Sequence, residues 1–247
     1  MWFLINPYQF AAVWPSNWLL NNLSAYYKCD TNGSFPDAHW SNNWTINGAT
    51  FTASGQINWA YDYDWTNDYI SVPDSTDLDL WVGWGDFSFS FWINPDVAPS
   101  NWTKNRMLFA KTPWWWDDAY YLNWRYIDAS NNALRLLISS NWTTSETLDV
   151  NVAISLSTWT HIVWIFDASA STWTVYKDNV SQWTATWTIT SLHNSAWALN
   201  IWQINSGTLQ YDWKLDEIWI WKTLLDSTNV SDLYNSWSWL SYDSFTS

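Results

Sequence analysis

Few carboxylates in this chain are placed to do acid–base chemistry. Hydrolysis of a glycosidic bond uses two carboxyl groups about 5–9 Å apart. The only two glutamates, Glu146 and Glu217, lie far apart in the sequence and in no alternating acidic cluster. Asp212 and Asp216, close to Glu217, fall in a strand-like run. The pattern therefore does not predict a catalytic carboxylate pair.

Nucleophilic catalysis and zinc binding are not indicated either. His39, His161 and His193 are isolated, and no Gly-x-Ser-x-Gly motif accompanies a serine. His161 lies in a strand-like run, where we expect it to pack. The single cysteine, Cys29, follows Tyr-Tyr-Lys and is expected to be a small buried strand residue. No His and Cys spacing fits zinc. The chain is therefore expected not to be an enzyme, with no catalytic residue assigned.

Calcium is the best candidate among cofactors. Asp117 and Asp118, and also Asp74, Asp77 and Asp79, offer carboxylate oxygens of the kind calcium prefers. None of them has the spacing of an EF-hand loop, and acidic loop residues are mostly just solvated. The sequence therefore assigns no metal ligand.

Composition limits the partners. The net charge is −14, with only nine Lys and Arg residues, so a basic face for nucleic acid is not expected. No apolar stretch is long enough to span a bilayer. The first residues lack the basic and apolar regions of a standard secretory signal peptide.

The elements that must position any site are β-strands. Phe87, Phe89 and Phe91 alternate with smaller or polar neighbours, a period of two. Similar runs cover residues 69–72, 106–111, 119–127, 133–139, 159–167, 172–177, 198–204 and 214–220. One short helix is expected near the end, capped by Ser227 or Thr228, with residues 230, 233 and 234 on one face. Residues 1–22 are expected to form an arm or attachment segment.

Tryptophan is abundant where glycine is expected. The chain has 28 Trp and only 6 Gly. Several Trp follow Asn or Asp, where glycine would make a strong turn signal: Trp18, Trp44, Trp59, Trp65, Trp102, Trp124, Trp142 and Trp213. True Asn-Gly pairs remain at residues 32–33 and 47–48. A bulky residue forced to positive φ costs about 1–2 kcal/mol. Many such strained sites, together with the Trp run at residues 114–116, would make the sequence energetically unfavourable if every one of these residues is tryptophan.

A genetic-code effect would explain this excess. We hypothesise that most of these codons are UGA read as glycine, as in some uncultured bacteria and their phages. Trp92, Trp159 and Trp221 are expected to be genuine because they lie at strand positions; Trp124 and Trp164 are not assigned. The alternative is a true aromatic platform for carbohydrate.

Four motifs in order resemble the laminin-G-like, concanavalin A-like jelly-roll family. They are the stretches 60–73, 86–93, 159–167 and 211–221, with Trp65, Trp213 and Trp219 at positions where the family has glycine or small residues. The resemblance implies an all-β, two-sheet antiparallel sandwich over residues 23–247. It also implies a structural role for Asp212, Asp216 and Glu217, and relatives of this kind often bind calcium at the sandwich rim.

The expected function is recognition without catalysis. The resemblance implies a module on a phage particle or cell surface that binds glycan or protein through loops or a sheet face. Residues 2–10 resemble a leader of phage particle proteins if Trp2 is glycine, so other virion proteins are expected partners of the arm. The alternatives are a purely structural decoration or spacer domain of a virion and, least favoured, a glycoside hydrolase.

Overall fold

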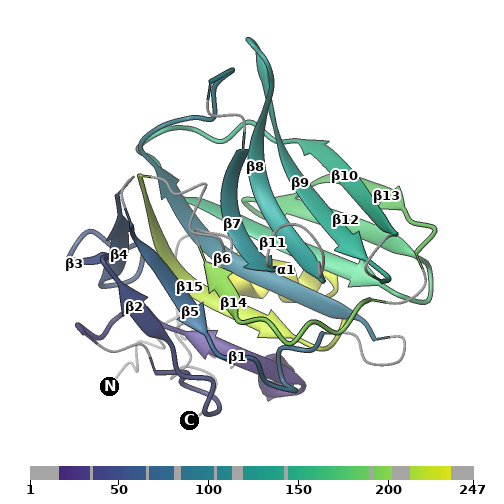
Figure 1. The fold of residues 1–247 in the computed structure, drawn as a ribbon, viewed down its shortest axis with the longest axis horizontal. Helices are drawn as coiled ribbons and strands as arrows, with labels where there is room; N and C mark the ends of the chain where they lie inside the picture. Colours follow the sequence, from purple (N-terminus) through teal and green to yellow (C-terminus); the bar gives the residue numbers. More distant parts are fainter. Residues whose placement is uncertain are drawn as a thin grey trace, which may run out of the picture.

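The computed structural model describes residues 17–33, 36–64, 67–80, 85–102, 105–112, 119–141, 144–189, 192–201 and 212–234. These residues form two antiparallel sheets, packed face to face, and one short α-helix (Figure 1). This architecture confirms the predicted jelly-roll sandwich. Within the described part of the chain, no helix is long and apolar enough to cross a membrane.

The larger sheet has eight strands and the smaller sheet seven. The larger runs in the order β13 (Val180–Thr186), β12 (Thr172–Lys177), β11 (Thr160–Asp167), β6 (Phe87–Pro95), β15 (Trp213–Trp221), β4 (Ala60–Tyr63) and β3 (Thr50–Thr52). Its eighth strand, β1 (Leu23–Tyr27), also pairs with β15. The smaller runs in the order β10 (Ser145–Asn151), β9 (Asn131–Ser139), β8 (Tyr120–Asp128), β7 (Asn105–Lys111), β14 (Leu199–Ile201), β5 (Tyr69–Val72) and β2 (Thr45–Asn47). β15 is thus a central strand that pairs with β1, β4 and β6.

Period-two alternation places the aromatic side chains between the sheets. Phe87, Phe89 and Phe91 of β6 are all buried in the main core. Phe89 and Phe91 contact Phe109 of β7, with ring centroids 5.5 and 4.9 Å apart. Each such pair adds about 0.5–1.5 kcal/mol beyond the burial of its area. These contacts hold the two sheets together.

The helix α1 (Ser227–Tyr234) packs on the face of the larger sheet that points away from the core. Val230 is fully buried in a second apolar cluster, together with Val163 of β11 and Trp221 of β15. Tyr234 stacks on Trp92 of β6, with centroids 5.9 Å apart. The predicted helix and its apolar face are confirmed.

The cap of α1 lies one residue earlier than expected. The sequence predicts a cap at Ser227 or Thr228, but Asp226 is the capping residue. Its carboxylate accepts a hydrogen bond from the Asn229 backbone N–H at 2.8 Å, and its own N–H donates to Asn229 Oδ1 at 2.7 Å. This reciprocal pair has the geometry of a capping box and satisfies two backbone donors at the helix start.

Two expectations about strand positions are wrong. Trp159 is half-buried and lies directly before β11 rather than within it. Cys29 is buried as expected, but it follows the end of β1 and has a left-handed backbone with φ 62°. Burial raises the pKa of its thiol well above the usual value, with Asp216 and Glu217 adding to the effect. A reactive thiolate is therefore disfavoured at this position.

The turn interpretation of the Trp pairs fails at two positions. Trp124 lies inside β8, and Trp213 is the first residue of β15. No described Trp has a positive φ, so the expected backbone strain is absent from that part of the chain. Gly33 and Gly48 do adopt φ of 75° and 80°, which confirms the Asn-Gly turns. Trp65, Trp114, Trp115, Trp116 and Trp142 lie outside the described residues.

Several buried indole N–H groups have no hydrogen-bond acceptor. Buried tryptophans usually find one, and Trp221 donates to the Leu19 carbonyl at 2.7 Å. Four others are buried without a partner for Nε1: Trp124, Trp164, Trp173 and Trp187. Each unpartnered buried donor costs about 1–3 kcal/mol. The energetic cost of these tryptophans therefore comes from unpartnered N–H groups in the core and not from strained turns.

A matched pair of substitutions measures this cost. Trp173→Phe and Trp221→Phe remove similar volume from fully buried sites. Trp221→Phe also leaves the Leu19 carbonyl without its donor, whereas Trp173→Phe removes a group that has no acceptor. We expect Trp221→Phe to be more destabilising by about 2 kcal/mol, measured by urea unfolding. Equal losses for the two variants would mean that the Trp173 N–H is satisfied in solution.

Candidate functional site

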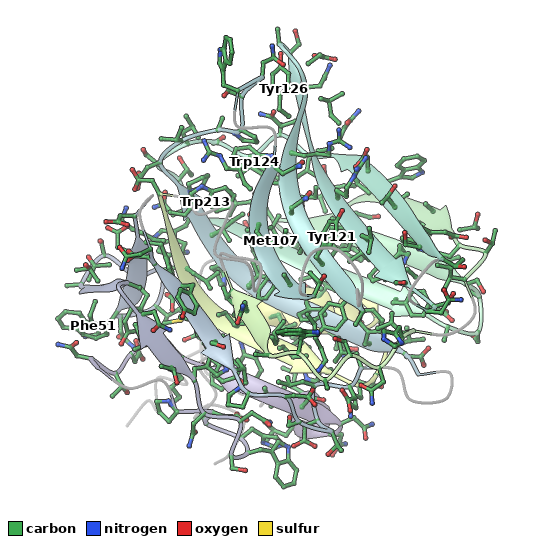
Figure 2. The ribbon with its side chains drawn as sticks, viewed as in Figure 1. Phe51, Met107, Tyr121, Trp124, Tyr126 and Trp213 are labelled. Carbon is green, nitrogen blue, oxygen red and sulfur yellow. The ribbon has the colours of Figure 1, made fainter. Side chains whose placement is uncertain are left out.

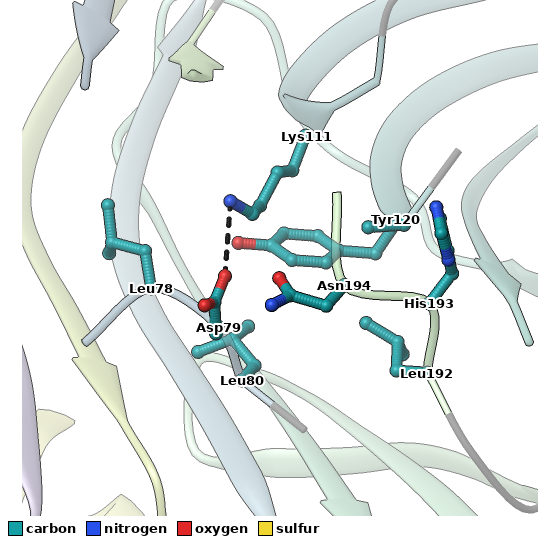
Figure 3. A pocket seen from close by; sticks show the side chains of 9 residues that line it. Leu78, Asp79, Leu80, Lys111, Tyr120, Leu192, His193 and Asn194 are labelled. Atoms are coloured by element: carbon teal, nitrogen blue, oxygen red, sulfur yellow. Dashed lines mark ion pairs between the residues drawn. The ribbon is translucent and has the colours of Figure 1, made fainter. Parts of the chain in front are cut away.

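A small polar pocket lies where β7 ends and β8 begins, beside the loops that follow β5 and precede β14 (Figure 3). We call it the rim pocket. The described residues that line it are Leu78, Asp79, Leu80, Lys111, Ala119, Tyr120, Leu192, His193 and Asn194. The free space within it holds the centre of a single water-sized molecule, about 10 Å³. A shallow groove along Thr76, Gly85, Asp86 and Lys222 shares Asp79 and Leu80 with this lining.

Lys111 is the buried cation of the rim pocket. Only 1% of its side chain is exposed, and its ammonium group forms ion pairs with Asp74 and, at 3.3 Å, with Asp79. The same group donates to the backbone carbonyl of Trp197 at 3.2 Å. A buried charge is tolerated only when it is paired and hydrogen-bonded, and these three partners meet that need. One positive and two negative charges leave a net negative site.

The hydroxyl of Tyr120 and Oδ1 of Asp79, both in the rim pocket, make no hydrogen bond in the structure. The Tyr120 side chain is 2% exposed, and its hydroxyl has no hydrogen-bond partner. Oδ1 of Asp79 is also buried and accepts no hydrogen bond, although it lies in the ion pair with Lys111. Figure 3 shows the Tyr120 hydroxyl directed toward this ion pair. Burial raises the pKa of the Tyr120 hydroxyl, with Asp79 and Asp74 adding to the effect, so the group stays protonated.

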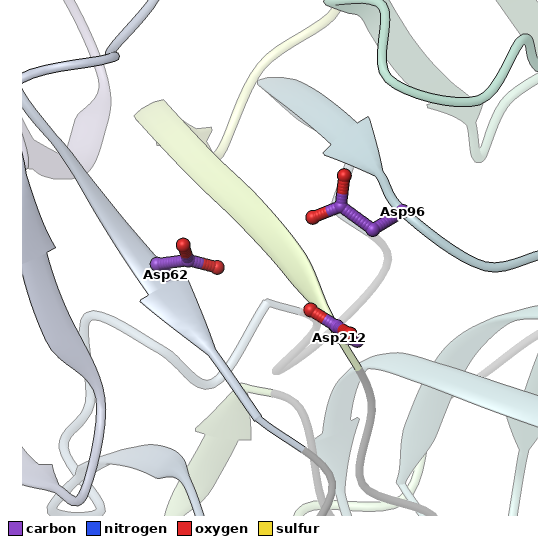
Figure 4. Close-up of side chains that lie close together, drawn as sticks. All are labelled: Asp62, Asp96 and Asp212. Carbon is purple, nitrogen blue, oxygen red and sulfur yellow. The ribbon is translucent and has the colours of Figure 1, made fainter.

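A second acidic cluster lies at the ends of β4, β6 and β15 (Figure 4). Carboxylate oxygens of Asp62, Asp96 and Asp212 come within 4.8 Å of one another. Lys214 lies among them, with its ammonium 2.9 Å from Asp96 and 3.7 Å from Asp62. Burial raises the pKa of Asp62, and Lys214 opposes that shift. The cluster therefore already contains its own cation.

The calcium candidates have protein partners where the structure describes them. Asp74 and Asp79 bind Lys111, as described above. Asp77 accepts a weak hydrogen bond from the Asn42 amide at 3.5 Å. Asp117 and Asp118 lie outside the described residues. The sequence did not anticipate the cluster of Fig. 4, because its members come from three distant strands.

The other carboxylates bind the backbone and neighbouring side chains. Asp216 is fully buried and accepts from the backbone N–H groups of Gln56 and Ile57 at 2.9 and 2.8 Å. Burial raises its pKa well above the usual value, and the neighbouring Glu217 contributes. Glu217, also buried, accepts from the Tyr26 hydroxyl. Glu146, on the exposed strand β10, accepts from Thr188.

A serine–histidine contact exists that the sequence did not reveal. Ser90 Oγ and His161 Nε2 are 2.8 Å apart, a distance suited to proton transfer. Both side chains are fully buried, and Tyr234 of α1 stacks on the imidazole with centroids 5.8 Å apart. Burial lowers the pKa of His161 to about 3. The pair is therefore packed beneath the helix, in agreement with the packing role expected for His161.

The outward face of the smaller sheet is a further surface. Met107 and Ala110 are buried there and pack against Tyr121 (Figure 2). Arg135 of β9 holds Asp149 of β10 through two hydrogen bonds of 2.7 Å. The charges on this face are thus paired with each other, whereas the rim pocket has unused donors and acceptors.

Comparison with known proteins finds a family model and several solved structures that share this fold. A family model described as the Concanavalin A-like lectin/glucanases superfamily matches residues 64–231. No curated protein matches the chain.

Among solved structures, the chain is similar to the binding domain of Paraclostridial Mosquitocidal Protein 1 (TM-score 0.71, 15% identity, 89% of this chain and 53% of that one). It is also similar to the binding domain of Botulinum neurotoxin DC in complex with rat synaptotagmin II (0.67, 11%, 89% and 53%). A third similar structure is domain 4 of a GH43 extracellular arabinanase from Geobacillus stearothermophilus, in complex with arabinotriose (0.63, 19%, 86% and 98%). The chain spans about half the length of the toxin domains, and these identities show a shared fold alone.

Proposed function

Because the chain belongs to the concanavalin A-like lectin/glucanases superfamily, we propose that it is a non-catalytic recognition module that binds glycan or protein. The observation that carries the proposal is the rim pocket, which has unused polar groups in a fold shared with binding domains. Catalysis has less support, since Ser90 and His161 are buried and Lys214 occupies the cluster of Asp62, Asp96 and Asp212.

A glycan array tests this function. The probe is the purified full chain, with and without calcium, and the expected result is binding to a restricted set of neutral oligosaccharides. Calcium dependence would support a bound metal ion, for which Asp117 and Asp118 are candidate ligands by sequence alone. An array without hits, combined with no capture of cell-surface protein, would contradict the recognition function.

A structural decoration or spacer domain of a virion is the second candidate. Strand β13 lies at an edge of the larger sheet, its seven residues carry no charge, and Val180 and Trp183 are exposed. Edge strands normally carry features such as charges that prevent pairing with another chain. An uncharged edge of this kind suits contact with neighbouring subunits. A gene among capsid or tail genes, and a lattice contact through β13 in the particle, would favour this role.

The proposed setting is a phage particle or another extracellular surface, with UGA codons read as glycine. The unpartnered indoles Trp124, Trp164, Trp173 and Trp187 support the recoding, as does Trp102, which is 94% exposed. Mass spectrometry of the protein from its natural source decides the matter. Glycine at these positions with tryptophan at Trp92, Trp159 and Trp221 is expected; tryptophan throughout would instead favour an aromatic platform for sugars.

A further inference from the structure

Two buried polar atoms of complementary kind in the rim pocket make no hydrogen bond, although Asp79 Oδ1 is ion-paired with Lys111. Tyr120 offers a hydroxyl donor, and Asp79 offers the acceptor Oδ1. The free volume of the rim pocket, about 10 Å³, corresponds to a single water-sized molecule. A group that accepts from Tyr120 and donates to Asp79 would satisfy both. A hydroxyl group or a water molecule has this combination of one donor and one acceptor.

The charges of the pocket select against ions. Lys111 neutralises only one of the carboxylates of Asp74 and Asp79, so an anion would be repelled. A divalent cation would need several free oxygen ligands, and here the ammonium of Lys111 already lies against both carboxylates. A neutral hydroxyl meets neither obstacle.

We infer that the rim pocket binds one hydroxyl group of a neutral saccharide, which accepts a hydrogen bond from Tyr120 and donates one to Asp79. The inference rests on the proposed glycan-binding function and assigns it a site. His193 is half-buried and Asn194 is exposed, so both can contact the rest of the sugar. The groove that shares Asp79 and Leu80 gives the saccharide room to extend.

The described part of the site does not depend on how the UGA codons are read. None of its nine described lining residues is tryptophan. Trp197 contributes only its backbone carbonyl to Lys111, and a glycine at that position would supply the same group. The inference therefore applies to both versions of the chain.

The test measures saccharide affinity for matched tyrosine variants. The probes are arabinotriose and a panel of neutral monosaccharides with their monodeoxy analogues, titrated by calorimetry and NMR against the full chain. Tyr120→Phe removes one hydrogen bond and should weaken binding about five- to tenfold. Tyr61→Phe is the control, because its hydroxyl donates to the Thr31 carbonyl at 2.7 Å, outside the pocket. It should leave affinity unchanged.

Deoxy analogues identify the hydroxyl. Removal of one particular sugar hydroxyl should weaken binding to the native chain more than to Tyr120→Phe, since the variant has only the bond to Asp79 left to lose. Asp79→Asn should also weaken binding, and its unfolding curve separates misfolding from loss of the site.

Three results would overturn the site. Native affinity in both Tyr120→Phe and Asp79→Asn would place the sugar elsewhere and leave the proposed function intact. A saccharide-soaked crystal with only water between Tyr120 and Asp79 would do the same. Absence of saccharide binding by the native chain would instead remove glycan binding together with this site.

Discussion

Replacement of Lys111 by methionine is expected to lower the free energy of unfolding by about 3–5 kcal/mol. The substitution fills similar space but removes the ammonium group that is paired with Asp74 and Asp79 and donates to the Trp197 carbonyl. The Asp79 side chain is 8% exposed and would stay buried without its counter-charge. Urea unfolding at pH 7 measures the loss.

Lys214 provides the matched control. It too lies between two aspartates, Asp62 and Asp96, but 18% of its side chain is exposed. Asp62 and Asp96 are about one-third exposed, so water can solvate them when the ammonium is removed, and Lys214→Met should cost clearly less than Lys111→Met. The double variant Lys111→Met with Asp79→Leu should recover much of the lost stability, because both buried charges are gone. Similar losses for the two lysine variants would show that burial is not what makes Lys111 important.

Acid should destabilise the native chain through His161. The pKa of this imidazole is about 3 in the folded protein because of burial, compared with about 6.5 when unfolded. The unfolded chain therefore binds a proton between these values and the folded chain does not. The stabilising contribution is complete above pH 6.5 and is lost as the pH falls toward 3, with about 3 kcal/mol lost by pH 4.

His161→Gln isolates this contribution. Its amide can still contact Ser90, and it does not titrate. The difference in unfolding free energy between native and variant should shrink by about 3 kcal/mol from pH 7 to pH 4. The comparison cancels groups with the opposite dependence, such as Asp178, whose pKa burial raises and whose carboxylate accepts from the His161 backbone N–H. A pH-independent difference would mean that the imidazole becomes protonated without unfolding.

The sandwich could be predicted because alternation is a local signal. The run from Phe87 to Phe91 determines which side chains face the core, and the expected strands at 69–72 and 172–177 match β5 and β12. Strands β10 and β13 were missed because their residues are largely polar and exposed. The Asn-Trp and Asp-Trp pairs led to wrong turn predictions for a related reason. Two adjacent residues do not reveal the surrounding element, and Trp124 and Trp213 lie inside strands.

The candidate site could not be predicted in the same way. Lys111 appears in the sequence only as a charged residue at the end of an apolar run, and Asp74 and Asp79 appear only as loop acids. Their contact depends on loop paths that bring residues more than thirty positions apart together. His161 differs, because its position inside a strand-like run correctly indicated burial.

The central position of β15 constrains synthesis of the chain on the ribosome. β1, β4 and β6 emerge early, but each pairs with a strand that begins at residue 213. Until β15 leaves the exit tunnel, the edges of β1, β4 and β6 that pair with it in the native sheet have no partner. These edges remain exposed to other nascent chains. Productive folding of the larger sheet therefore waits for β15, and truncation before Trp213 should yield aggregates and no smaller folded core.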